Sequence, residues 1–107
     1  MDNNKLLIGD KEFTIYGELE SGVFSTKEGC ILIVARKINS TYHYLKIGTY
    51  KYYSDIEIKK FNEGDNICFC FLGINDLKKR KETLKEILKI INENSLIIKE
   101  ENIICEN

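Results

Sequence analysis

The chain has 107 residues, the length of one domain built around one hydrophobic core. Its 16 Lys and Arg residues nearly balance its 17 Asp and Glu residues, so the net charge of −1 favours neither a uniformly basic nucleic-acid binder nor a strongly acidic DNA mimic. No apolar run approaches the roughly 20 residues of a membrane span, and the first residues lack the apolar region of a signal peptide. We therefore expect a soluble, cytoplasmic protein.

The first two-thirds of the chain has the residue pattern of β-strands. Apolar and polar residues alternate or form short β-branched and aromatic runs, separated by clusters of Gly, Asn, Ser and Asp that are typical of turns. Met1–Asn4 is polar, and we expect it to be frayed. The strands expected before the last turn are Phe13–Glu20, Val23–Thr26, Cys30–Ala35, Tyr42–Tyr53, with a break at Gly48, and Ile56–Ile58. The expected turns are Ser21-Gly22, Lys27–Gly29, Asn39-Ser40 and Asn62–Asp65.

Two of the strand-like segments are apolar throughout. Cys30–Ala35 and Ile67–Leu72 are each six consecutive apolar residues, too short for a helix and typical of strands buried on both faces. One helix can cover only one face of a small sheet. Either the sheet curls around its own core, or a second subunit covers the other face, which would make the protein a homodimer.

The hydrophobic period changes at Asn75. Asp76–Asn94 is predicted to be one amphipathic helix, with Asn75 or Asp76 capping its first turn. Its apolar face is centred on Leu84 and includes Leu77, Ile87, Leu88, Ile91 and Ser95. The opposite face carries Glu82, Glu86, Lys89 and Glu93. After the helix, Leu96–Ile98 and Ile103–Cys105 are expected to be short strands or a docked tail.

These patterns predict a single α+β domain spanning residues 1–107. It has a mostly antiparallel sheet of five to seven strands, or a partly closed barrel, with one long C-terminal helix. We expect one core in which the two apolar strands meet the helix. Its predicted members are Ile31, Ile33, Phe69, Phe71, Leu84, Leu88 and Ile91.

The four cysteines favour packing over chemistry. Without an export signal the compartment is expected to be reducing, which disfavours a disulfide framework. Cys68 and Cys70 are two residues apart, so in a strand both would point to one face. That pair is half of a metal site, but it lacks the Cys-x-x-Cys spacing and the His partners of zinc sites. We expect Cys30, Cys68 and Cys70 to be core residues, and we predict no metal and no cofactor.

The segment from Arg36 to Lys60 is locally basic, with six cations, two acids and five of the six tyrosines. In a strand, Tyr42, Tyr44 and Lys46 would share one face. Such a face could stack bases and hold phosphates. The alternative is that Tyr has a high β-propensity and that Lys keeps an exposed strand soluble.

A second basic feature is the run Lys78, Lys79, Arg80 and Lys81 at the predicted start of the helix. The helix dipole disfavours cations there by about 0.3–1 kcal/mol each. Cations beside free helix N–H groups suit an anionic ligand or an acidic partner surface. The alternative is a solvated lysine face, with Arg80 lying along Leu77.

His43 is the only histidine, so any triad or His-based metal site would depend on it. On the strand face of Leu45 and Ile47, we expect it to be a partly buried neighbour of the core. There is no glycine-rich phosphate loop and no paired-carboxylate pattern. We therefore predict that the protein is not an enzyme.

The function predicted by elimination is that of a small interaction protein that docks on a macromolecular protein partner. Heavy use of Ile, Lys and Asn suggests an AT-rich genome, and small size suits a phage or mobile-element product that inhibits a host defence system. The alternative is an anion-binding module for a nucleotide or nucleic acid. That module would use the Tyr and Lys strands and the basic helix start.

Overall fold

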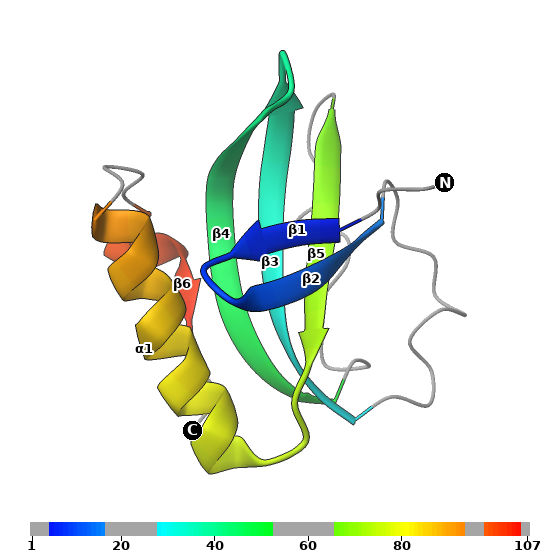
Figure 1. Ribbon diagram of the computed structural model, residues 1–107. Coiled ribbons are helices and arrows are strands. Elements are labelled where there is room, and N and C mark those ends of the chain that lie inside the picture. Colours follow the sequence, from blue (N-terminus) through cyan, green and yellow to red (C-terminus); the bar gives the residue numbers. More distant parts are fainter. Residues whose placement is uncertain (1–4, 17–27, 53–65, 94–97, 106–107) are drawn as a thin grey trace.

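The computed structural model describes residues 5–16, 28–52, 66–93 and 98–105. Within these residues it has six strands in one sheet and one long helix (Figure 1). The strands lie in the order β1-β2-β5-β3-β4-β6; all neighbouring pairs are antiparallel except β4–β6, which is parallel. The α+β prediction is confirmed, and the sheet is open rather than closed into a barrel. The elements are β1 (Lys5–Ile8), β2 (Lys11–Tyr16), β3 (Glu28–Ile38), β4 (Thr41–Tyr52), β5 (Ile67–Gly73), α1 (Leu77–Glu93), the 3-10 helix η3 (Glu100–Asn102) and β6 (Ile103–Ile104).

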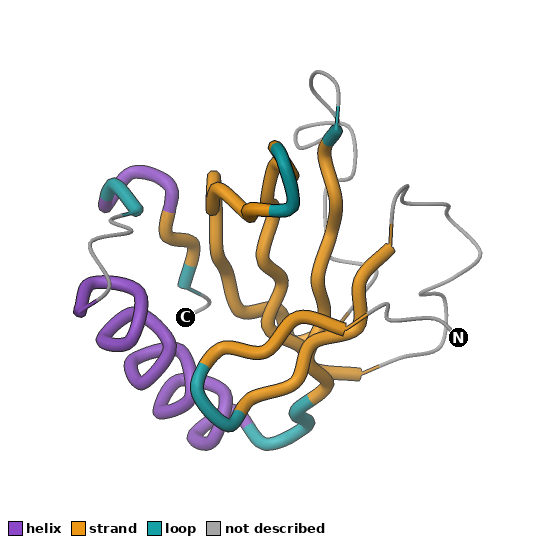
Figure 2. Tube along the Cα trace, turned by 45° about the horizontal axis from the view of Figure 1, so that its top comes forward, coloured by secondary structure: helices purple, strands orange, loops and turns teal. Residues whose placement is uncertain are grey.

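The β1–β2 hairpin, whose first strand was missed in the sequence pattern, crosses in front of β3, β4 and β5 (Figures 1 and 2). Along β1, Leu6 and Ile8 are buried and Leu7 is 66% exposed, so only one face packs. Gly9 opens the two-residue turn with a φ of 63°, which glycine adopts without steric cost. A Cβ at Gly9 would lie 2.6 Å from Cδ1 of Ile90, so this turn sits directly against α1.

The β3–β4 hairpin turns at Asn39 and Ser40, as predicted. Both residues have positive φ, 49° and 68°, and Ile38 pairs with Thr41 on either side of them. Positive φ at both central residues is the requirement of a type I′ turn, whose twist matches that of the flanking strands. The turn therefore fixes the register of the two longest strands.

A β-bulge, rather than a break at Gly48, interrupts the regular pairing of β4. Lys46 pairs with Val34 and Tyr44 pairs with Ala35, so Leu45 is an extra residue on β4. An extra residue reverses the alternation of faces beyond it. The side chains before and after Leu45 therefore do not follow one continuous two-residue period.

β6 pairs with β4 at its outer edge. Ile103 pairs with Ile47 and Ile104 with Gly48. A Cβ at Gly48 would lie 3.0 Å from the Cβ of Ile104, so the glycine allows the last strand to approach closely.

Helix α1 begins one residue after Asp76, which caps it as predicted. The Asp76 carboxylate accepts a hydrogen bond from the backbone N–H of Lys79 at 3.0 Å. The side chains that α1 buries span about 100° of the helix at 100° per residue; they are Arg80, Thr83, Leu84, Ile87 and Ile91. This buried face is rotated from the predicted apolar face. Leu77, which was predicted to lie on the apolar face, is 39% exposed.

The apolar residues form two clusters on opposite faces of the sheet, not the single predicted core. The pleat of β3 sends Ile31 and Ile33 toward α1 and sends Leu32 and Val34 to the other face. The α1 cluster contains Leu6, Ile8, Phe13, Ile31, Ile33, Ala35, Ile47, Cys68, Cys70, Leu84, Ile87, Ile91 and Ile98. The opposite cluster contains Cys30, Leu32, Val34, Ile67, Phe69 and Phe71. Phe69 and Phe71 were therefore assigned to the wrong core, whereas Leu88 packs at the edge of the α1 cluster.

Both faces of the central strands are buried within one chain. Leu32, Phe69 and Phe71 are at most 4% exposed without a second subunit. The uncovered face that suggested a homodimer is therefore not present. Self-association stays a prediction without that support.

Several predicted segments lie outside the described residues. They are Met1–Asn4, residues 17–20 of the first predicted strand, Ser21-Gly22, Val23–Thr26, Lys27, Tyr53, Ile56–Ile58, Asn62–Asp65, Asn94 and Ser95 at the end of the helix, and Leu96 and Ile97.

Truncating Leu84 tests the packing of α1. Leu84 is 3% exposed, so Leu84→Ala should lower the free energy of unfolding by about 2–5 kcal/mol, the cost of a lost transfer term plus a cavity. The matched control is Leu77→Ala on the same helix, expected to change it by less than about 0.5 kcal/mol. Urea denaturation measures both. Equal effects would show that α1 does not dock through this face.

Candidate functional site

Arg80, predicted to bind a partner or an anion, is instead part of the fold. It is 2% exposed. One guanidinium nitrogen, Nη1, donates hydrogen bonds to the carbonyl oxygens of Ile74 at 3.0 Å and Asn75 at 2.7 Å. The side chain therefore joins the first turns of α1 to the segment that leaves β5, and it is not available to a ligand.

Gly29 makes room for this contact. A Cβ at Gly29 would overlap the carbonyl oxygen of Ile74 and lie 2.5 Å from Nη1 of Arg80. The backbone N–H of Ile74 also donates to the carbonyl oxygen of Gly29 at 2.9 Å. The start of β3, the end of β5 and the start of α1 are thus held at one point.

The exposed lysines of α1 form a stripe that the linear sequence does not show. At 100° per residue, four of them fall within about 80° of one another, and we call them the lysine stripe. They are Lys78, Lys81, Lys85 and Lys89, all exposed. Lys79 is also exposed, but it lies about 100° around the helix from Lys78 and outside the stripe. The predicted cluster of four consecutive cations is therefore divided among three directions.

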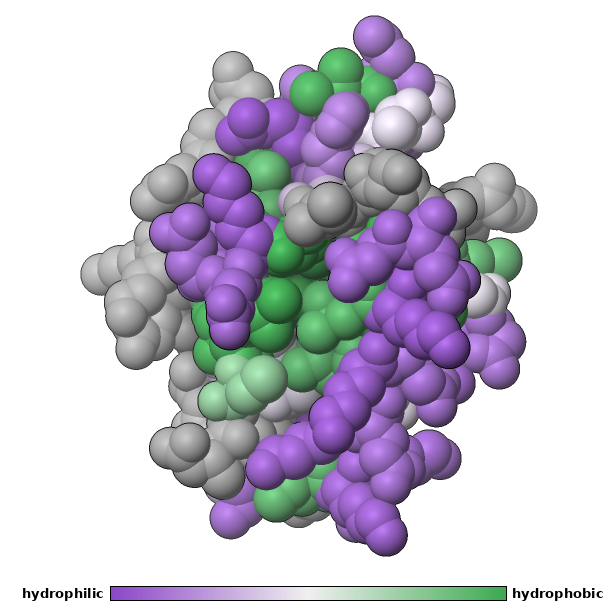
Figure 3. Space-filling view, turned by 90° about the vertical axis from the view of Figure 1, so that its left-hand side faces the viewer, coloured by the Kyte–Doolittle hydropathy of each residue, from purple (hydrophilic) through white to green (hydrophobic). Residues whose placement is uncertain are grey.

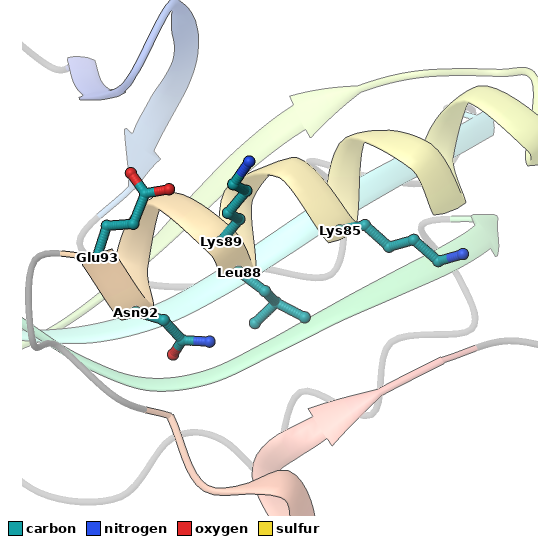
Figure 4. A pocket seen from close by; sticks show the side chains of 5 residues that line it. All are labelled: Lys85, Leu88, Lys89, Asn92 and Glu93. Atoms are coloured by element: carbon teal, nitrogen blue, oxygen red, sulfur yellow. The ribbon is translucent and has the colours of Figure 1, made fainter.

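One side of the lysine stripe borders a shallow groove on α1 (Figure 4). The groove encloses about 500 Å³ and is open to solvent. Leu88 and Asn92 point from α1 toward β4 and β6, while Lys89 and Glu93 extend the other way. The described residues that line this α1 groove are Lys85, Leu88, Lys89, Asn92 and Glu93.

The surface around the groove is apolar in the middle and hydrophilic on both sides. Figure 3 shows a hollow of hydrophobic residues between a hydrophilic ridge that follows α1 and a second one on the side of η3. Leu88 of α1 and Ile103 of β6 are both partly buried against the α1 cluster. They lie on the two elements between which the hollow is found. On η3, Glu100 and Glu101 are exposed. The hollow therefore has the exposed lysines of α1 on one side and the element that carries these two glutamates on the other.

The other side of α1 is occupied by the β1–β2 hairpin. Lys11 forms ion pairs with Glu86 at 3.1 Å and with Asp10 at 3.2 Å. Hydrogen bonds to these carboxylates, Glu86 first, raise the pKa of Lys11. The lysine stripe therefore lies between a closed side of the helix and an open one.

The predicted Tyr and Lys face of β4 does not exist, because the bulge at Leu45 divides it. Tyr42 and Tyr44 pack against the α1 cluster, whereas Lys46 pairs with Val34 of the opposite cluster. Tyr44 is half-buried, and burial, followed by the nearby Cys70, raises the pKa of its hydroxyl. The two tyrosines are core neighbours rather than an exposed platform for bases.

His43 is exposed, not a partly buried core neighbour. Ile47, expected to share its strand face, packs in the α1 cluster, whereas Leu45 packs against the opposite one. The bulge accounts for this difference as well, since it lies between His43 and Ile47.

Cys68 and Cys70 point to one face and are buried, as the packing interpretation predicted. A hydrogen bond from Cys70, opposed by burial, lowers the pKa of Cys68, and the ammonium of Lys37 lowers it further. The same hydrogen bond and burial raise the pKa of Cys70. Cys30 is buried on the other face and Cys105 is exposed.

Within the described ranges, no three or more His, Cys, Asp and Glu side chains are placed to hold a metal ion. The same part of the chain has no helix with the length and apolar character of a membrane span. No family model, curated protein sequence or solved structure gives a significant match to this chain.

None of the five described groove residues was predicted as a site from the sequence; they are Lys85, Leu88, Lys89, Asn92 and Glu93. The lysine spacing of three, four and four residues from Lys78 was visible in the sequence, and a helical wheel centred on the lysines would have found the stripe. The neighbouring hollow could not be found that way, because it depends on where β6 and η3 return to the sheet.

Substituting Arg80 tests its structural role. Arg80→Met should lower the free energy of unfolding by about 2–4 kcal/mol, because two carbonyls would lose a charged donor. Lys81→Met, at the next residue and exposed, should change it by less than about 0.5 kcal/mol. Thermal and urea unfolding measure both variants. A fully stable Arg80→Met protein would contradict this role.

The thiol pair predicts a pH dependence. The pKa of Cys70 is raised above its ordinary value of 9.0, so its contribution to stability is complete below pH 9 and is lost as the pH rises. The pKa of Cys68 is lowered, so above pH 9 the unfolded chain loses both thiol protons while the folded pair keeps the one on Cys70. Cys68→Ala/Cys70→Ala should therefore flatten the fall in unfolding free energy above pH 9, by at most about 1.4 kcal/mol per pH unit. Cys105→Ala, at an exposed thiol, should leave that slope unchanged. An identical slope in all three proteins would refute the assignment.

Proposed function

We propose that this protein is a non-catalytic interaction protein that docks on a protein partner through the α1 groove. The observation that carries the proposal is the apolar hollow beside Leu88, bordered by the lysine stripe. An apolar centre with a polar rim is the arrangement of many protein–protein interaction sites, and the hollow beside Leu88 has it on a small scale. The groove lies on a helix and a sheet edge that the core holds in place, so it is formed before a partner arrives.

The shape of the groove favours a macromolecule over a small ligand. Small-molecule sites bury most of the ligand, about 70–90% of its surface. The α1 groove is open to solvent, and its described lining comes from one helix. A small molecule lying there would stay largely in water, whereas a polypeptide segment can cover the hollow and reach both rims.

The alternative function is an anion-binding module for a nucleotide or nucleic acid. Only some of the residues predicted to form its binding surface are exposed. Tyr42 and Tyr44 pack against the α1 cluster, and Arg80 is buried. The exposed lysines of α1 are the remaining support. Phosphate-driven binding would weaken log-linearly with salt, whereas docking in an apolar groove would not.

A role as a phage or mobile-element inhibitor of host defence is part of the same proposal. Its support is the small size and the AT-rich residue usage, with 14 Lys against 2 Arg. Such an inhibitor acts by occupying a surface of its target, which requires a docking site and no catalytic group.

Leu88→Asp should abolish capture of the partner from cells of the source organism, because it places a charge in the middle of the apolar hollow. Leu88 is partly buried, so Asn92→Trp, at an exposed position that lines the groove, serves as a second variant that blocks the site. Leu7→Asp, at a leucine of β1 that is 66% exposed, is the matched control. Quantitative pull-down with all four proteins measures the effect. If both groove variants capture the same partner as well as the wild type does, the interface lies elsewhere.

A further inference from the structure

We propose that the occupant of the α1 groove is an acidic amphipathic helix of another protein, lying along α1. This inference rests on the proposed function and names the partner chemistry of the same site. The helix would place apolar side chains in the hollow beside Leu88 and carboxylates against the lysine stripe. Three observations lead to it: the spacing of the lysines, their position relative to the apolar residues, and the opposite charge of η3.

The spacing of the lysines matches a helix better than an extended strand. The stripe advances by three, four and four residues from Lys78 to Lys89, or about 16 Å in all at 1.5 Å per residue. A partner helix alongside α1 repeats its side chains at the same pitch, so carboxylates three or four residues apart stay opposite the lysines. In a strand, side chains on one face repeat about every 6.7 Å, so four carboxylates would span about 20 Å. They would not stay opposite the four lysines of the stripe.

The lysines lie next to the apolar side of the groove. Going around α1 at 100° per residue, the buried face is followed by Leu77 and Leu88, then by the lysine stripe, and then by the glutamates. A partner helix must therefore carry its carboxylates directly beside its apolar residues. This is the pattern of anchors at i, i+3, i+4 and i+7 with acidic residues along one flank.

A second copy of this chain does not fit that requirement. On α1 the lysines separate Leu77 and Leu88 from Glu82, Glu86 and Glu93. An α1 helix of another copy, placed with its leucines in the hollow, would turn its own lysines toward the lysine stripe in one orientation. In the reversed orientation it would turn toward the stripe the side that is buried against its own sheet, which carries no carboxylate. Neither orientation places a carboxylate opposite a lysine of the stripe, so charge complementarity favours a different protein as the partner.

The glutamates of η3 favour one orientation of the partner helix. Glu100 and Glu101 are exposed on η3, the element on the far side of the hollow from α1. A partner helix that is acidic on the α1 side and neutral or basic on the other side fits both rims. Reversing that helix end to end would exchange its two flanks, so the two rims together select one orientation.

The test uses synthetic peptides of about the length of α1 and the full chain. The acidic peptide has leucines at i, i+3, i+4 and i+7, glutamates on one flank and glutamines on the other. The basic peptide has lysines in place of the glutamates, and the shuffled peptide has the acidic composition without the helical period. Fluorescence anisotropy should show saturable binding of the acidic peptide alone. It should also show competition by that peptide for the captured partner.

The protein variants test the stripe against general charge. Lys85→Glu/Lys89→Glu should weaken binding of the acidic peptide by at least about tenfold, and Lys85→Gln/Lys89→Gln should weaken it less. The matched control is Lys51→Glu/Lys79→Glu, which changes the net charge equally at two exposed lysines outside the stripe. Circular dichroism and thermal melts of each variant exclude unfolding as the cause.

Each result decides between the proposals. Equal binding of the acidic and basic peptides, or an equal loss in the control variant, would overturn the acidic helix. Displacement of the peptide by a single-stranded DNA oligonucleotide, with binding that falls log-linearly with salt, would replace it by nucleic acid. If Leu88→Asp loses the partner while Lys85→Glu/Lys89→Glu keeps it, docking in the groove stands and this inference fails. If Leu88→Asp has no effect on partner or peptide, the proposed function fails as well.

Discussion

Burial of both faces of the β3–β5 pair is the constraint on which the rest of this structure depends. The two central strands carry apolar side chains in both directions, so neither face of the sheet can meet water. The face that carries Ile31 and Ile33 is closed by α1 and by the β1–β2 hairpin, which crosses it and brings Leu6, Ile8 and Phe13 into the same cluster. The position of the helix, and hence of its outer surface, follows from that closure.

Arg80 shows why a run of like residues in sequence is a poor guide to a surface. A helix turns by about 100° per residue, so four consecutive cations cannot share one face. One of them reaches the carbonyl oxygens of Ile74 and Asn75 and holds the start of α1 against Gly29 of β3. The cations that do share a face are spaced along the helix, from Lys78 to Lys89. The unfavourable charge at the helix start is offset there by the capping carboxylate of Asp76.

The fold class was accessible from the sequence because period and run length decide it, and the change of period at Asn75 placed the helix within one residue of its observed start. The side chains on each face were less accessible. The pleat divided Phe69 and Phe71 from Ile31, and the bulge at Leu45 reversed the alternation that was used to group Tyr42 with Lys46. A bulge has no strong local signal, because it depends on how two strands pair. The groove beside Leu88 is a product of tertiary structure in the same way.

The buried face of α1 and its lysine stripe are two sides of one rigid element, and this links stability to recognition. The contacts of Ile87 and Ile91 with the sheet fix the rotation of the helix, and Arg80 fixes its start. A shift of α1 by one residue would turn the stripe by about 100°. In one direction the stripe would move toward the β1–β2 hairpin, where Lys11 already pairs with Glu86, and in the other toward the core. The core therefore keeps the lysines beside the open groove. A partner meets a surface whose backbone is already ordered, so docking there costs less conformational entropy than docking on a loop.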